Sequence, residues 1–223
     1  MARFIQREGT KGSQKWIQKL INEKHQLLDS QIKEKLKIPD EEKIKWLSPL
    51  KSDEYAEYRD QAFLELLGAR LETLPLESFW PKRGPQWDAL GKSSSEKLVL
   101  VEAKSHIPEL FSTLRAKRKS SENKILESLA ETKMALGSKT DFDWSKGFYQ
   151  YANRLAILHL LKMNKLSAFF VNVYFVNDVE MNGPSTADEW KGAIRLLHRC
   201  LGLREHLLKK FAADIFVDVA NLK

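Results

Sequence analysis

Three charged residues near the middle of the chain, Asp88, Glu102 and Lys104, have types and spacing that could hold a metal ion. Glu102 and Lys104 end the run 97–105, whose alternation of side chains has the period of a β-strand. On a strand, side chains two residues apart share a face and lie about 6.6 Å apart. Two carboxylates beside an amine suit a hard divalent cation with a positive charge nearby.

Asp88 faces Glu102 if the two segments form a β-hairpin whose turn is centred on their midpoint. That midpoint, (88+102)/2, is position 95, and Ser95 lies inside the polar stretch 91–96. The register of a hairpin is fixed by its turn, so this position of the turn places the two carboxylates opposite each other. We therefore expect Asp88, Glu102 and Lys104 to converge.

An Asp at the end of one strand and Glu-x-Lys on the next resembles the PD-(D/E)XK nuclease superfamily, also called restriction-endonuclease-like. The matching positions are Asp88 and Glu102-Ala103-Lys104, with Trp87 in place of the usual Pro and Pro85 close by. The resemblance covers about residues 53–176. It implies an α/β fold with a restriction-endonuclease-like core, in which helices flank a central mixed β-sheet.

The resemblance also implies an activity. The protein would be a metal-dependent endonuclease or exonuclease that hydrolyses phosphodiester bonds of nucleic acid, DNA in preference to RNA. Asp88, Glu102 and the carbonyl of Ala103 would bind Mg²⁺ or Mn²⁺. Lys104 would orient the attacking water or stabilise the charge that develops on the phosphate.

In this superfamily the helix before the hairpin often supplies a further acidic residue. We expect a helix at 54–67, and Glu65 falls at the edge of its apolar stripe, which makes it the candidate by geometry. An ordinary surface glutamate is the alternative. Branches of the superfamily carry Gln-x-x-x-Tyr on a later helix, and here Gln150 and Arg154 share a face of the apolar helix expected at 148–163. These two residues either orient Lys104 and hold a phosphate, or form a buried structural network.

The formal net charge is +7 and the pI is about 9.3, a balance that favours polyanionic partners without proving one. The candidate nucleic-acid contacts are two groups of basic residues and one single arginine. The alternative for the two groups is an ordinary solvated surface charge, and the alternative for the single arginine is a structural role. They are Lys82 and Arg83 before the hairpin, Arg115, Lys117, Arg118 and Lys119 after it, and Arg154. His106 continues the face of Glu102 and Lys104, as a hydrogen-bond donor to the site, as a base or as a structural residue.

The remaining elements place this region in a larger chain. We expect residues 1–50 to form an N-terminal helical extension, with helices at 13–36 and before Leu47, and residues 51–223 to form the nuclease-like domain. Further helices are expected at 121–136, 187–200 and 204–211, a buried central strand at 168–176 and an edge strand at 213–219. The extension could pack on the domain, lie along nucleic acid or pair two subunits into a homodimer.

Composition limits the class of protein. Hydrophobic residues make up 43% and charged residues 30%, which is typical of a soluble globular chain. Cys200 is the only cysteine, which excludes an internal disulfide, and no signal peptide is evident. The longest apolar stretches are too short to cross a bilayer. We therefore expect a cytoplasmic protein that does not bind membranes.

Two other functions share these features. One is a catalytically inactive nucleic-acid-binding module of the same fold, and the other is a scaffolding protein that dimerises through its N-terminal helix. Other enzyme classes lack their motifs, because the chain has no Gly-x-x-x-x-Gly-Lys-Ser/Thr loop, no Gly-x-Ser-x-Gly elbow and no His-Glu-x-x-His pair. Five histidines and one cysteine also make a zinc site a poor expectation.

Overall fold

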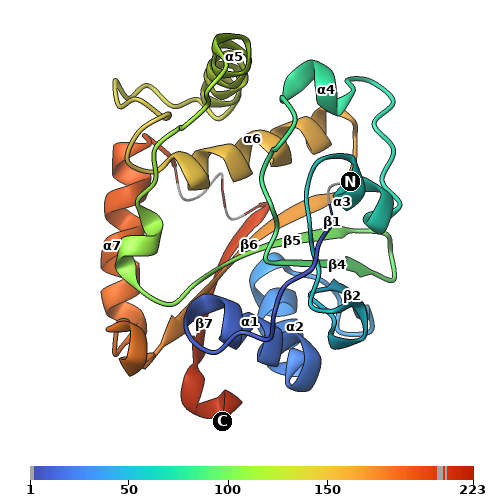
Figure 1. Cartoon of the computed structure of the whole chain (residues 1–223), viewed down its shortest axis with the longest axis vertical. Helices are drawn as coiled ribbons and strands as arrows, with labels where there is room; N and C mark the ends of the chain where they lie inside the picture. Colours follow the sequence, from blue (N-terminus) through green and yellow to red (C-terminus); the bar gives the residue numbers. More distant parts are fainter. Residues whose placement is uncertain (1–2, 205–207, 209) are drawn as a thin grey trace.

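The centre of the molecule is a five-stranded mixed β-sheet, seen in a computed structural model that describes residues 3–204, 208 and 210–223 (Figure 1). The strand order is β2-β4-β5-β6-β7. The first three strands are antiparallel and the last three are parallel. In chain order the strands are β2 (Ile44–Ser48), β4 (Ala89–Ser93), β5 (Leu98–Lys104), β6 (Ala168–Val176) and β7 (Ala212–Asp218).

The hairpin of β4 and β5 has the predicted register. Ala89 pairs with Val101, and the backbone N–H of Asp88 donates to the carbonyl of Val101 at 3.2 Å. Asp88 therefore lies opposite Glu102, at the end of the hairpin away from its turn. Strand β4 continues through Ser93, so the polar stretch that looked like turn in the sequence also contributes to the strand.

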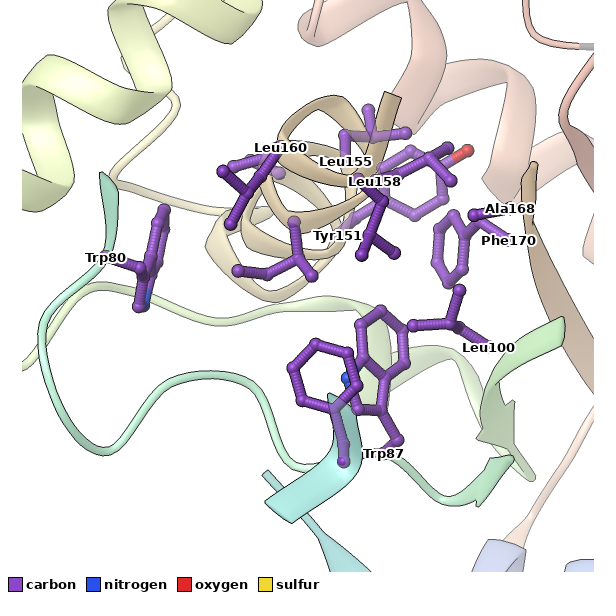
Figure 2. Close-up of a cluster of buried hydrophobic side chains, with 14 of the residues drawn as sticks. Trp80, Trp87, Leu100, Tyr151, Leu155, Leu158, Leu160, Ala168 and Phe170 are labelled. Carbon is purple, nitrogen blue, oxygen red and sulfur yellow. The ribbon is translucent and has the colours of Figure 1, made fainter. Parts of the chain in front are cut away.

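One face of the sheet is covered by helix α6 (Tyr149–Met163), most of whose side chains are buried. Its leucines, Leu155 and Leu158 among them, pack above Leu100 of β5 and Phe170 of β6, as Figure 2 shows. Four more helices share this hydrophobic core: α3 (Asp60–Leu67), α4 (Leu76–Phe79), α5 (Lys119–Ala135) and α7 (Ala187–Cys200). A helix buried on most sides matches the prediction from its sequence.

The opposite face of the sheet is covered by α1 (Gly12–Glu23) and α2 (His25–Leu36), whose apolar residues pack on valines of β5 and β6. The single helix expected at 13–36 is thus two helices that meet at Lys24. The helix expected before Leu47 is wrong, because these residues form strand β2 and pair with β4. Helices α1 and α2 therefore pack on the sheet, and β2 is one of its strands.

A second correction concerns the segment before α3. The helix expected from Glu54 begins only at Asp60. Glu54 and Tyr55 have φ values of 54° and 51°, a left-handed conformation that an α-helix cannot continue. The chain then forms the short strand β3 (Glu57–Tyr58), which pairs with β1 (Arg3–Phe4). Glu57 consequently lies outside the helix.

The later elements follow their predictions. Strand β6 lies between β5 and β7 as the buried central strand, and β7 is at the sheet edge. Helix α7 starts after Thr186, whose Oγ1 accepts a hydrogen bond from the N–H of Glu189 at 3.3 Å. The helix expected at 204–211 lies largely outside the described residues. Across the described ranges, no helix combines the length and the apolar character that crossing a membrane requires.

Short 3₁₀ turns complete the chain and link it to the site. They are η1 (Lys51–Asp53), η2 (Ile107–Leu110), η3 (Val179–Met181) and η4 (Val219–Leu222). Ser105 and His106 connect β5 to turn η2. Glu109 of this turn accepts hydrogen bonds from the N–H of Ser105 at 2.6 Å and from the hydroxyl of Ser13 at 3.0 Å. Helix α1 thereby helps to hold the segment that leaves the end of β5.

Candidate active site

Asp88, Glu102 and Lys104 meet at the open end of the β4–β5 hairpin. The Nζ of Lys104 donates to Oε1 of Glu102, and Glu102 is only 4% exposed. Asp88 accepts a hydrogen bond at Oδ2 from the backbone N–H of Ala103 at 2.7 Å. Strand geometry alone places these groups, since two come from one face of β5 and the third from its partner position at the start of β4.

Helix α6 supplies Gln150 and Arg154 to the same carboxylate. Gln150 donates to Oε1 of Glu102 at 2.7 Å and accepts from Lys104 at 3.0 Å. Arg154 donates from Nε to Oε2 at 2.7 Å, and its Nη2 lies 2.6 Å from the same oxygen in an ion pair. Both α6 side chains therefore bind the carboxylate of Glu102, and Gln150 also contacts the ammonium of Lys104. Contact with Lys104 and a buried network, which the sequence left as alternatives, thus occur in the same set of hydrogen bonds.

Arg154 is held by more than its bond to Glu102. Its Nη2 donates to the carbonyl of Gln86 at 2.6 Å, and its guanidinium carbon lies 4.9 Å from the centroid of the Trp87 ring. Arg154 is only 3% exposed. A guanidinium so far from water needs these partners, because an unpaired buried charge is strongly destabilising.

Glu57, which the sequence analysis did not single out, is the additional carboxylate of the site. It is 8% exposed, accepts from Gln86 Nε2 at 2.5 Å and from Gln6 Nε2 at 3.1 Å, and lines the same cavity as Asp88. Because α3 begins at Asp60 and not at Glu54, Glu57 lies outside the helix. No pattern in the sequence indicated that Glu57 would lie near Asp88.

Glu65, the predicted acidic residue of the preceding helix, is not brought to Asp88. It is exposed on α3 and lines a separate hollow with Arg3, Lys82 and Arg83. The delayed start of α3 explains the exchange, because the carboxylate that faces Asp88 precedes the helix. By position, Glu57 takes the place expected for Glu65.

The charges at the site shift one another's ionisation. Withdrawal from water and the nearby Glu102 raise the pKa of Asp88 well above its usual range. Burial also raises the pKa of Glu57, an effect that its amide donors only partly oppose. Burial alone would raise the pKa of Glu102, but the charges of Arg154 and Lys104 outweigh it and lower that pKa.

Lys104 remains protonated in this environment. Burial alone would lower its pKa, but the negative charges of Glu102 and Asp88 outweigh that effect and raise it. A buried lysine held as a cation places a fixed positive charge beside the carboxylates. Such a charge suits an anionic reacting group better than it suits a neutral one.

A cavity of about 450 Å³ opens beside Asp88. Glu57, Gln150 and Arg154 line it from the protein interior, and Arg83 lies in its wall. Of the other predicted phosphate contacts, Lys82, Arg115, Lys117 and Arg118 are exposed outside this cavity, and Lys119 pairs with Glu122 at 3.0 Å at the start of α5. His106 turns to Glu109, with 3.3 Å between Nδ1 and Oε2. Cys200 is a free, half-buried thiol at the end of α7.

The residues present fit a divalent ion held by two carboxylates. Asp88 accepts its backbone hydrogen bond at Oδ2, so Oδ1 could bind a cation, and the positive charge would favour the ionised form of its carboxyl, whose pKa is raised. The carbonyl of Ala103 points to the same side of β5 as its N–H, which contacts Asp88. Glu102 can join only by exchanging one of its cationic partners. Within the described part of the chain, no group of three or more His, Cys, Asp or Glu is arranged as a metal-ligand set.

Comparison with known proteins adds no relative. The chain matches no protein-family model, no curated protein and no solved structure. The assignment of function therefore depends on the geometry of the site.

Proposed function

We propose that this protein is a metal-dependent nuclease with a restriction-endonuclease-like core, which hydrolyses phosphodiester bonds of DNA in preference to RNA. The observation that carries the proposal is the convergence of Asp88, Glu102 and Lys104, on one face of a hairpin, beneath a helix that supplies Gln150. Each of these residue types has a defined task in phosphodiester hydrolysis.

Asp88, Glu102 and the carbonyl of Ala103 would hold Mg²⁺ or Mn²⁺. A bound ion of this kind lowers the pKa of a coordinated water and polarises a phosphoryl oxygen. Lys104 places its ammonium where negative charge develops on the phosphate or orients the attacking water. Gln150 fixes the ammonium by accepting from it at 3.0 Å while donating to Glu102.

Arg154 keeps Glu102 ordered and neutralised. Arg154 also donates to the carbonyl of Gln86 and faces the Trp87 ring. Its guanidinium would therefore stay in place if an oxygen of Glu102 bound a metal ion. The acidic side of the site is thus organised in advance, which reduces the reorganisation that catalysis requires. In this proposal Arg154 positions Glu102 and takes no proton.

A second candidate is a catalytically inactive nucleic-acid-binding module of the same fold. The observation that favours it is that both oxygens of Glu102 already accept hydrogen bonds from cationic side chains. The charge of Glu102 is therefore neutralised without a metal ion. The two candidates differ in whether Asp88 and Glu102 bind a divalent ion.

The test is cleavage of labelled single- and double-stranded DNA and RNA in Mg²⁺, in Mn²⁺ and in a chelator. We expect metal-dependent cleavage by the wild type and a loss of about 10²–10³-fold in Lys104→Ala, which removes one fixed charge from the transition state. Lys97→Ala is the matched control, since Lys97 lies at the turn of the same hairpin and pairs with Glu42, which precedes β2, at 2.6 Å. Equal rates in Lys104→Ala and wild type would refute the assigned role.

A further inference from the structure

Phe111 is a large apolar side chain left in solvent next to the site. It is 57% exposed and directly precedes Ser112. Ser112 lines the cavity beside Asp88, and its Oγ accepts a hydrogen bond from the N–H of Gln150 at 2.6 Å. The ring therefore stands one residue from the cavity wall.

The Phe111 ring is supported on its inner side. Its centroid lies 5.2 Å from that of Phe148, whose centroid lies 5.9 Å from that of Phe142, with interplanar angles of 33° and 29°. Phe148 is buried, and a Cβ at Gly147 would come within 3.0 Å of the Phe142 ring, so glycine permits this row. The three rings form a fixed row with an aromatic surface at its solvent end.

The segment after Phe111 is extended. The N–H of Ser112 donates to the carbonyl of Gly147 at 2.7 Å, and the N–H of Leu114 donates to the carbonyl of Ser145 at 2.8 Å. Alternate residues then face solvent, and Thr113, Arg115 and Lys117 are all exposed. Side chains two apart on such a segment lie about 6.6 Å apart.

The two cations on this face, Arg115 and Lys117, have no acidic partner among the residues that the structure describes. Neither Arg115 nor Lys117 makes an ion pair with any acidic residue in the described ranges, whereas the neighbouring Lys119 is paired with Glu122. The segment leads from the end of β5 to α5 (Figure 1). An exposed aromatic ring and unpaired cations thus follow one another along a segment whose Ser112 lines the cavity.

We propose that the exposed face formed by Phe111, Thr113, Arg115 and Lys117 binds a single-stranded polynucleotide that enters the cavity. A base stacks on Phe111, and phosphates contact Arg115 and Lys117. Aromatic rings combined with basic side chains are the means by which proteins hold single strands, because a duplex keeps its bases stacked on each other. This inference rests on the proposed nuclease function and names its substrate class as single-stranded or frayed nucleic acid.

The test is fluorescence anisotropy with labelled single-stranded DNA, single-stranded RNA and the matching DNA duplex, in a chelator so that binding is measured without cleavage. We expect a single strand to bind more tightly than the duplex, and the tighter of the two single strands identifies the sugar. Phe111→Ala should weaken that binding by roughly 5- to 150-fold, and Phe111→Trp should retain it. Leu196→Ala, equally exposed at 57% on α7, should change nothing.

Salt dependence tests the two cations. Each phosphate contact on a single strand contributes about 0.7 to the slope of log K against log salt, so Arg115→Ala and Lys117→Ala should each reduce the slope by about that amount. Lys45→Ala, an exposed lysine of β2, should leave the slope unchanged. Circular dichroism of each variant shows that a change in binding does not come from unfolding.

The outcomes separate this inference from the nuclease proposal. Equal affinity of wild type and Phe111→Ala for the single strand, or tighter binding of the duplex, overturns the binding face even if the protein cleaves DNA. Phe111-dependent binding of the single strand supports the binding face even if no metal produces cleavage, and the nuclease proposal then fails alone.

Discussion

A lysine of the β4–β5 hairpin pairs with a glutamate at each end of the hairpin, Lys97 with Glu42 of the segment before β2 and Lys104 with Glu102 of β5, and the two pairs differ in their surroundings. At the turn, Lys97 lies 2.6 Å from Glu42, which also accepts a hydrogen bond from the hydroxyl of Ser95 at 2.6 Å. At the open end, Lys104 pairs with Glu102 beneath α6, away from solvent. The same kind of ion pair therefore occurs in two environments, one at each end of the hairpin.

The difference lies in the balance of charge. At the turn, donors from Lys97 and Ser95 lower the pKa of Glu42 to about 2, so the pair is satisfied. At the open end, burial raises the pKa of Asp88 and of Glu57, although Lys104 and Arg154 are close. Two carboxyl groups with raised pKa values thus line one cavity. Shifted pKa values beside a cavity are typical of a functional site rather than of a structural ion pair.

The largest expected effect on stability distinguishes the two glutamates. Glu102→Ala leaves the charges of Arg154 and Lys104 buried without their shared carboxylate, so we expect a loss of about 3–5 kcal/mol in the free energy of unfolding. Glu42→Ala should shift the urea midpoint little, because surface ion pairs stabilise weakly. Equal midpoints for the two variants in urea unfolding would remove the contrast between the ends.

The contributions of Asp88 at the open end and of Glu42 at the turn to the pH dependence of stability should have opposite signs. The raised pKa of Asp88 contributes stability below its ordinary value near 3.9, and this is lost as pH rises through the folded-state pKa. The lowered pKa of Glu42 contributes stability above its ordinary value near 4.3, and this is lost as pH falls toward about 2.

Thermal unfolding in a chelator from pH 2 to pH 8 measures both signs. Asp88→Asn should be more stable than the wild type at neutral pH, by about 1.4 kcal/mol for each pKa unit removed. Glu42→Gln should be less stable than the wild type above pH 5 and should converge with it near pH 2. Parallel pH profiles of wild type and Asp88→Asn would contradict a raised pKa of Asp88.

The smallest effect concerns the partner of Lys104. Gln150→Ala removes one of the two acceptors that orient the ammonium, and we expect cleavage to slow roughly tenfold, which corresponds to about 1.4 kcal/mol of a hydrogen bond to a charged group. Single-turnover kinetics provide the measurement. Ser95→Ala, which removes a donor to Glu42 at the turn, should leave the rate unchanged.

The sequence was sufficient for those features that depend on local arithmetic. A turn centred on Ser95 placed Asp88 opposite Glu102, and helical spacing put Gln150 and Arg154 on one face. Strand β2 was also accessible, because Ile44, Trp46 and Ser48 alternate inward, but five residues give a weak period. These features need no knowledge of distant segments.

The rest of the site depends on tertiary contacts. Glu57 reaches Asp88 only because the backbone reverses at Glu54 and Tyr55 and pairs with β1, which no local pattern indicated. That Arg154 would bind Glu102 rather than a phosphate likewise follows from how α6 packs on the sheet.

The most direct measurement is calorimetric titration of Mn²⁺ into the wild type, Asp88→Asn and Glu42→Gln. We predict that the wild type and Glu42→Gln bind one ion with the same affinity and that Asp88→Asn does not bind it. The reason is that a bound cation would stabilise the ionised form of Asp88, whose pKa is raised, whereas Glu42 already has its donors at the turn. Unchanged Mn²⁺ binding in Asp88→Asn, or no binding by the wild type, would contradict the account.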